Sequence, residues 1–238
     1  ELLHQSQYVV YQSYFCKRSA DTFLGKYNGK SEIIYNCVDT KLFKPDLEKI
    51  NSKPFTILLA GNIYRKSKFD LAAKVFYELK KNIKDAQMII AGNIHWLGSN
   101  KKECMAHVHE TLHKFNIRND TLLFGAYSQK QAPAIYNSAD VLIHPKNMDP
   151  SPGLVVEAMS CGVPVVFSKS GGTPELVGEK AGIGIETQEN WEKTYLPDPD
   201  LLAKAVLQIA ENKEEYSKAA RERAVKLFSI DLFVDKHR

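Results

Sequence analysis

The sequence lacks long apolar runs, closely spaced cysteines and a strong excess of either charge. No apolar stretch approaches the roughly 20 residues of a membrane-spanning helix, which excludes such a helix within these 238 residues. The scattered cysteines argue against a disulfide framework or a zinc finger and favour free thiols in a reducing compartment. They are Cys16, Cys37, Cys104 and Cys161. The net charge of +4 permits contact with phosphates or an anionic lipid surface, but no dense basic stripe predicts nucleic-acid binding.

What the sequence does contain is the composition of an ordinary globular domain. Apolar residues make up 44% of the chain and charged residues 25%, and no internal repeat or low-complexity segment is present. At 238 residues the chain is long enough for one large domain. It begins at Glu1 without a methionine and stops in the charged segment DKHR, so we expect a piece of a longer protein.

Strand-like and helix-like segments alternate through the middle of the chain. Residues 55–60 (FTILLA) form a continuous apolar run, which is typical of a central parallel strand. Amphipathic segments with helical spacing separate the strand-like runs. The alternation predicts an α/β fold with a doubly wound parallel sheet, whose ligands bind beyond the carboxyl ends of the strands. Further expected strands are 87–91, 121–124, 139–144 and 164–168, and the expected helices are 69–82, 101–115, 129–138 and 153–161.

The two ends of the chain follow a different pattern. Short strand-like and helix-like elements alternate near the start, and the chain becomes helical after Gly184. We therefore divide it into three parts. These are 1–35, the end of a preceding domain and its linker; 36–228, a Rossmann-like ligand-binding domain; and 229–238, the start of a last helix.

The segment 139–177 carries the features that point to a ligand. Ser151 is expected to cap the helix 153–161, with Pro152 in the first helical position and Gly162 after its end. A helix start presents free backbone N–H groups, which attract anions and phosphate in particular. The free groups expected here belong to Gly153, Leu154 and Val155.

Glu157 is an acid within this otherwise apolar helix, and a buried carboxylate requires a hydrogen-bonding partner. It lies four residues after Gly153 and therefore on the same helix face. A diphosphate on the amides and a vicinal diol on the carboxylate would fit one molecule, a nucleoside diphosphate sugar. Alternatively, Glu157 caps a neighbouring backbone group inside the core. The residues alone leave both interpretations open.

Three strings in this region are family signatures. Asp149 and Glu157 are two acids eight positions apart, EAMSCGVPVV follows, and then GGTPE. Together they resemble the retaining group 1 (family 4) glycosyltransferases of the GT-B fold. The resemblance implies the C-terminal, donor-binding half of that fold. QSQYVVYQS and IIYNCVDTKLFKP resemble the end of the family's N-terminal domain and the interdomain passage, with Cys37 in place of the usual glycine.

The resemblance also implies roles for individual residues. Glu157 would accept from the ribose hydroxyls, and Asp149 would accept from a hydroxyl of the donor sugar. The loops at Gly92-Asn93 and at Tyr127 would surround the base and ribose. The remaining expected donor contacts are Gly61, Asn62, Ser151, Gly153, Leu154 and Val155.

The family holds the donor diphosphate with the arginine and lysine of a GR-x4-KG string. Aligning on Gly61 puts Asn62 at the arginine position and Ser67 at the lysine position, and neither carries a charge. We expect the neighbouring Arg65 and Lys66 to supply it through their long side chains. The alternative is a solvated basic loop.

A second motif points elsewhere. His109 and His113 enclose a glutamate in the string HETLH, and two histidines at i and i+4 on a helix can bind zinc. No third ligand follows at metalloprotease spacing, and charged residues surround the string. An exposed helix face is the favoured interpretation, and a zinc hydrolase is kept as an alternative.

The expected activity is transfer of a sugar from a UDP- or GDP-sugar to an acceptor hydroxyl, with retention of configuration and no metal or other cofactor. The acceptor is a glycan, a lipid or a small molecule, and the missing N-terminal domain supplies most of its site. We expect a cytoplasmic protein, at the inner face of a membrane if the acceptor is a lipid. Alone, the chain should bind donor weakly and transfer poorly. The alternatives are a non-catalytic nucleotide-sugar-binding module and a GT-B isomerase or phosphorylase, although no lysine context suits the pyridoxal phosphate of a phosphorylase.

Overall fold

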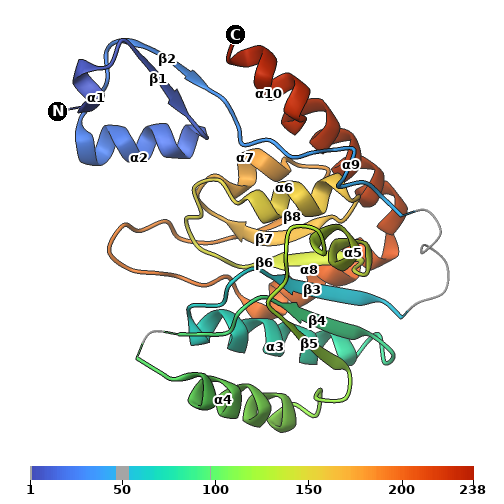
Figure 1. The fold of residues 1–238 in the computed structure, drawn as a ribbon. Coiled ribbons are helices and arrows are strands. Elements are labelled where there is room, and N and C mark those ends of the chain that lie inside the picture. Colours follow the sequence, from blue (N-terminus) through green and yellow to red (C-terminus); the bar gives the residue numbers. More distant parts are fainter. Residues whose placement is uncertain (1, 47–53, 97) are drawn as a thin grey trace.

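The computed structural model describes residues 2–46, 54–96 and 98–238, and within them the main element is a six-stranded sheet (Figure 1). Its strands pair in parallel in the order β5-β4-β3-β6-β7-β8, which confirms the predicted α/β class. The strands are β3 (Thr56–Ala60), β4 (Gln87–Ala91), β5 (Thr121–Gly125), β6 (Val141–His144), β7 (Val165–Lys169) and β8 (Gly182–Glu186).

Helices cover both faces of the sheet, so it is doubly wound (Figure 1). Apolar side chains of three helices form one buried cluster with the sheet, and those of four other helices form a second cluster on the opposite face. The first three are α3 (Lys66–Lys80), α4 (Lys101–Lys114) and α8 (Pro199–Glu211). The other four are α5 (Ala132–Asn137), α6 (Gly153–Ser160), α7 (Thr173–Val177) and α9 (Lys213–Phe228).

The order of the strands creates a crevice for a ligand. From β3 the chain moves through β4 to β5 on one side, and from β6 through β7 to β8 on the other. The direction therefore reverses between β3 and β6, and ligands of such sheets bind outside the carboxyl ends of the strands at this switch point.

Strand β8 was not predicted, because glycines interrupt its apolar pattern. A Cβ at Gly182 would lie 2.0 Å from the backbone oxygen of Val165, and one at Gly184 would lie 2.9 Å from the ring of Phe167. Only glycine lets β8 approach β7 this closely. The two glycines that interrupt the apolar pattern of β8 are thus the residues that permit its pairing with β7.

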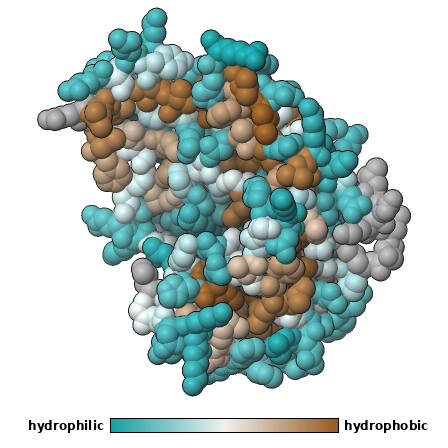
Figure 2. All heavy atoms as spheres, in the orientation of Figure 1, coloured by the Kyte–Doolittle hydropathy of each residue, from teal (hydrophilic) through white to brown (hydrophobic). Residues whose placement is uncertain are grey.

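The N-terminal residues form a small unit with its own two-stranded sheet, drawn in blue in Figure 1. Strands β1 (Tyr8–Tyr11) and β2 (Lys30–Ile33) pair in parallel, and α2 (Tyr14–Leu24) connects them; α1 (Leu2–Gln5) precedes them. Figure 2 shows apolar side chains gathered over this unit, and its exposed apolar residues include Leu2, Val10, Phe23 and Leu24. At the other end, α10 (Ile230–Lys236) follows α9. None of the helices in the described ranges has the length and apolar content needed to cross a membrane.

Candidate functional site

Two loops and the start of α6 meet at the switch point, and glycines let them pack closely. Gly61 follows β3 and Gly92 follows β4, both with positive φ angles, of +81° and +133°. A Cβ at Gly92 would lie 2.2 Å from the Gly61 carbonyl oxygen, and one at Gly61 would lie 2.9 Å from Cδ2 of Leu154 in α6. Glycine is therefore required by space as well as by conformation at Gly92, whereas at Gly61 the positive φ is the main constraint. The structure brings Gly61, Gly92 and Leu154, three of the expected donor contacts, close together.

A cavity of about 370 Å³, which we call the Lys68 cavity, opens beside these loops. Lys68 comes from the first turn of α3, and its ammonium lies 3.4 Å from the carbonyl oxygen of Ala60. Burial lowers the pKa of Lys68 to about 8, and the nearby charge of Lys146 acts in the same direction. The cavity is lined by Gly61, Asn62, Tyr64, Arg65, Ser67, Lys68, His144, Pro145, Lys146, Asn147, Asp149, Leu154, Thr194 and Leu196.

Asp149 is a buried carboxylate on the wall of this cavity. Its Oδ2 lies 3.1 Å from His144 Nε2 and 3.1 Å from Lys146 Nζ. Burial acts to raise the pKa of Asp149, but the hydrogen bond from His144 and the charge of Lys146 outweigh it and hold the pKa below its usual value. Burial also lowers the pKa of His144, although its hydrogen bond to Asp149 opposes this. Asp149 is therefore an anion held in place by a neutral imidazole.

The start of α6 differs from the prediction. Pro152, in extended conformation, is the capping position, and the helix begins at Gly153, so Ser151 is not the N-cap. The Ser151 hydroxyl instead accepts from the Asn36 side chain at 3.1 Å. The N–H of Val155 donates to the Pro152 oxygen at 3.1 Å and is not free.

Two N–H groups remain at this helix start. Those of Gly153 and Leu154 donate to no acceptor in the part of the chain that the structure describes. Gly153 is exposed, and a Cβ built on it would meet open space. The helix start is thus accessible to an anion.

Glu157 is half-buried and bound by two side chains. Its Oε1 accepts from Gln129 at 2.9 Å and its Oε2 from the Tyr136 hydroxyl at 2.8 Å. Burial, followed by the charge of Glu157, raises the pKa of Tyr136, so the phenol remains a donor. These partners are side chains rather than the backbone group of the alternative interpretation. Each carboxylate oxygen accepts a second hydrogen bond readily, so room for a ligand hydroxyl remains.

The basic residues of the loop are arranged differently from the expectation. Arg65 lines the Lys68 cavity, whereas Lys66 is the exposed first residue of α3 and does not line it. Sequence reasoning missed Lys68, which precedes the fully buried Phe69. That apolar residue was a usable signal, because it places the adjoining turn of α3 against the sheet.

A second cavity of about 640 Å³, the Asn93 cavity, adjoins the first and shares Asn62 and Tyr64 with it. Asn62 links the loops: its Oδ1 accepts from the Asn93 N–H at 3.3 Å, and its amide donates to Tyr64. Tyr127 does not line this cavity, and burial raises its pKa. The lining is Asn62, Tyr64, Ile90, Gly92, Asn93, Ile94, His95, Lys101, Met105, Leu123, Gly125 and Ala126.

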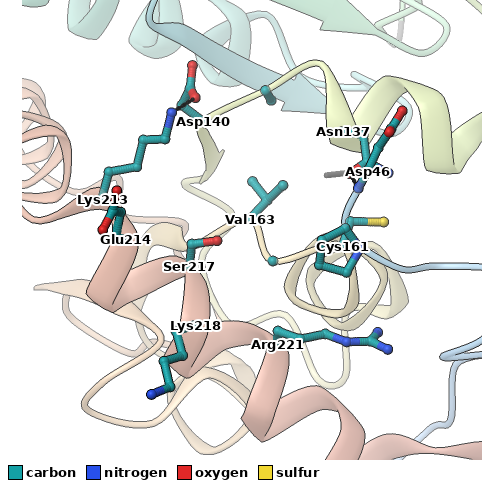
Figure 3. A pocket seen from close by; sticks show the side chains of 13 residues that line it. Asp46, Asn137, Asp140, Cys161, Val163, Lys213, Glu214, Ser217, Lys218 and Arg221 are labelled. Atoms are coloured by element: carbon teal, nitrogen blue, oxygen red, sulfur yellow. Dashed lines mark hydrogen bonds and ion pairs between the residues drawn. The ribbon is translucent and has the colours of Figure 1, made fainter. Parts of the chain in front are cut away.

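A further cavity of about 400 Å³ lies at the opposite, amino-terminal edge of the sheet (Figure 3). Three of its charged groups hold α9 to the rest of the domain. Asp140 accepts from the Thr56 N–H and from Lys213, each at 2.7 Å. Arg221 donates to the carbonyl oxygens of Thr40, Phe43 and Ser160. The charged residues of this amino-edge cavity therefore stabilise the packing of α9.

The HETLH string has no metal-site geometry. His109 is half-buried and His113 is exposed, and Thr111 between them bonds instead to the ring of His107, one turn earlier in α4. Over residues 2–46, 54–96 and 98–238, no three His, Cys, Asp or Glu side chains gather as metal ligands.

Comparison with known proteins identifies the family. The family model described as "Glycosyl transferases group 1" matches residues 41–226. The chain belongs to this family. Among curated relatives of this group 1 chain, a phosphatidylinositol N-acetylglucosaminyltransferase component from Homo sapiens is 26% identical over 147 residues, which is 62% of the chain and 28% of that protein. The D-inositol 3-phosphate glycosyltransferase of Segniliparus rotundus is 20% identical over 173 residues, 68% of the chain and 38% of that protein.

Solved structures share the fold. Sucrose-phosphate synthase from Thermosynechococcus elongatus superposes with a TM-score of 0.79 at 20% identity, covering 99% of this group 1 chain and 58% of the other. Anabaena Alr3699/HepE, solved in complex with UDP and glucose, gives 0.73 at 21% identity, with 99% and 63% covered. These neighbours are GT-B glycosyltransferases, and they show that this chain has the Rossmann-like fold of one half of a GT-B protein. The chain spans about a third of the length of the first curated relatives and under two thirds of these structures.

Proposed function

We propose that this chain is the donor-binding half of a retaining glycosyltransferase, which moves a sugar from a nucleoside diphosphate sugar to an acceptor hydroxyl. One observation carries the proposal: a partly buried cation, Lys68, and a buried carboxylate, Asp149, line one cavity beside the open start of α6. A diphosphate requires the cation, and sugar hydroxyls require the carboxylate. A nucleoside diphosphate sugar carries both groups in one molecule.

Lys68, Arg65 and the free amides of Gly153 and Leu154 hold the diphosphate in this proposal. Negative charge grows on the leaving diphosphate in the transition state, and donors already oriented in a partly buried site stabilise it most effectively. The reaction then needs no metal or other cofactor, because these groups neutralise the charge. The protein contributes positioning and electrostatics.

The nucleoside occupies the neighbouring Asn93 cavity. Its apolar walls, Ile94 and Met105 among them, suit the faces of a base, and backbone groups near Gly92 and Asn93 suit its edge. Glu157 accepts from the ribose hydroxyls with the acceptor capacity that Gln129 and Tyr136 leave free. Alr3699/HepE, a solved relative in fold, was crystallised with UDP and glucose, which supports the choice of ligand class.

Asp149 accepts from a hydroxyl of the donor sugar and orients it. His144 holds the carboxylate in position, and the lowered pKa keeps it an anion. Such an anion is suited to binding a hydroxyl rather than to acting as a general base.

The acceptor is a glycan, a lipid or a small molecule bound mostly by an N-terminal domain beyond this chain. The exposed apolar side chains of the β1–α2–β2 unit suit such a neighbour (Figure 2). The donor half alone then binds nucleotide sugar weakly and transfers poorly. With its free cysteines the chain suits the cytoplasm, and a lipid acceptor would bring it to the inner face of a membrane.

A thermal-shift panel of UDP- and GDP-sugars tests the proposal, since a bound donor raises the melting temperature by mass action. At least one donor should stabilise the wild type, and Lys68→Ala should clearly reduce the shift at the same donor concentration. Lys204→Ala, which removes an exposed lysine of α8, is the matched control and should keep it. A panel without any shift, or an undiminished shift in Lys68→Ala, would contradict the proposal.

A second candidate is a non-catalytic nucleotide-sugar-binding module. It is favoured by Asn62, an uncharged residue at the arginine position, whose side chain is engaged with Asn93 and Tyr64. Turnover of donor by the full-length protein, lost in Glu157→Ala, would exclude the module. Binding without turnover would favour it.

A further inference from the structure

The segment between β8 and α8, residues 187–197, contains no helix or strand and forms a long loop that we call the 187–197 strap (Figure 1). Its middle is anchored on the N-terminal unit. Trp191 stacks on Phe15 of α2, with ring centroids 5.4 Å apart, and meets Phe23 edge-on at 5.0 Å. Arg18 of α2 forms an ion pair of 2.6 Å with Glu189.

The strap is also bonded to the loop that carries Asp149. The backbone oxygen of Gln188 accepts from the Asn147 amide at 3.1 Å, and the N–H of Asn190 lies 3.2 Å from the sulfur of Met148. Met148 has a positive φ of +51°, which is unfavourable for a residue with a side chain. Neighbouring contacts must hold such a conformation, and the strap supplies part of them.

Beyond Trp191 the strap returns along the Lys68 cavity. Thr194 and Leu196 line it together with Asp149 and Lys68. Leu196 keeps 39% of its surface exposed, although burial in the core would be favourable for a leucine. The cavity thus offers an apolar side chain and a hydroxyl on one wall, and a carboxylate and an ammonium on others.

We propose that the 187–197 strap recognises the sugar of the donor, through contacts of Leu196 and Thr194, and that Trp191 holds the strap in place. The inference rests on the proposed function, because it concerns the donor of that reaction. A pyranose presents hydroxyls at its edge and C–H groups on its faces. Asp149 takes the hydroxyls, and Leu196 covers a C–H face. The class of ligand is a nucleoside diphosphate hexopyranose rather than a free nucleotide.

The proposal predicts that the strap discriminates the sugar nucleotide from the nucleotide. The test uses calorimetric titration of UDP and of UDP-sugars, or of GDP and GDP-sugars, against wild type, Leu196→Ala and Thr194→Ala. Leu196→Ala should weaken the sugar nucleotide about tenfold, which is typical of removing apolar contact to a substrate, and leave the free nucleotide unchanged. Leu201→Ala, which truncates an exposed leucine of α8 outside the cavity, is the matched control.

The outcomes separate the two proposals. If the wild type binds neither free nucleotides nor sugar nucleotides, the proposed function fails and the strap's role falls with it. If the wild type binds but Leu196→Ala binds both ligands unchanged, or loses both equally, the strap proposal alone is overturned. The melting temperature of each free variant guards against misfolding. Trp191→Ala should reproduce the selective loss, because it releases the strap from α2.

Discussion

The amino ends and the carboxyl ends of the sheet strands each have a buried aspartate that is paired with a lysine. The two aspartates differ in how many of their oxygens are hydrogen-bonded. At the amino edge, Asp140 accepts from Thr56 on one oxygen and from Lys213 on the other. At the carboxyl edge, His144 and Lys146 both contact Oδ2 of Asp149, and Oδ1 has no donor among the described residues. A saturated buried charge stabilises the fold, whereas a partly satisfied one retains capacity for a ligand.

Substitution of each aspartate by alanine tests most directly whether the two carboxylates have different roles. Asp140→Ala should cost about 3 kcal/mol in the free energy of unfolding, because a buried N–H and an ammonium lose their acceptor. Asp149→Ala should cost clearly less, since Lys146 is exposed to water, but should abolish sugar transfer by the full-length protein. Urea unfolding and turnover assays measure the two effects. Equal destabilisation by both changes would remove the distinction.

Substitution of the two lysines, Lys213 and Lys68, should likewise separate an effect on stability from an effect on binding. Lys213→Met leaves the carboxylate of Asp140 without its ammonium and should cost about 2 kcal/mol. Lys68→Met removes a cation whose burial is unfavourable, so stability should stay within about 0.5 kcal/mol, while affinity for the nucleoside diphosphate falls about tenfold. Parallel urea unfolding and titration calorimetry test this. Lys68→Met that unfolds as readily as Lys213→Met would show Lys68 to be a structural residue.

The pH dependence of binding isolates Lys68. Only its protonated form attracts a diphosphate, and its pKa of about 8 means that this form is lost as the pH rises. Affinity for the free nucleotide should therefore fall about tenfold between about pH 7.5 and about pH 9.5. Lys68→Arg stays charged over this range and should show a flat profile. A wild-type profile as flat as that of the arginine variant would contradict the assignment.

The smallest expected change in stability distinguishes the uncapped start of α6 from the capped start of α4. In α4, Asn100 accepts from the Glu103 N–H and Glu103 from the Asn100 N–H, so Asn100→Ala should cost about 1 kcal/mol. Ser151 does not cap α6, so Ser151→Ala should cost less than about 0.5 kcal/mol. Thermal unfolding compares the variants. A larger loss in Ser151→Ala than in Asn100→Ala would restore the predicted cap.

Sequence reasoning succeeded where the signal is local and repeated. The apolar run 55–60 and the alternation after it predict buried parallel strands, because strands covered on both faces need apolar side chains at every position. The prediction failed where a residue's role depends on its neighbours in space. Lys66 and Lys68 cannot be distinguished by residue type. Only the position at which α3 begins decides which of them lines the cavity.

The sequence by itself determined the α/β class and the alternating strands and helices between residues 55 and 168, since these follow from patterning along the chain. Only the tertiary structure decided which charges are saturated. It brought His144 and Lys146 onto one oxygen of Asp149, turned Ser151 toward Asn36, and brought Leu196 to the Lys68 cavity. The physical reason is that hydrogen bonds and burial depend on distances between segments far apart in the chain, which no local pattern encodes.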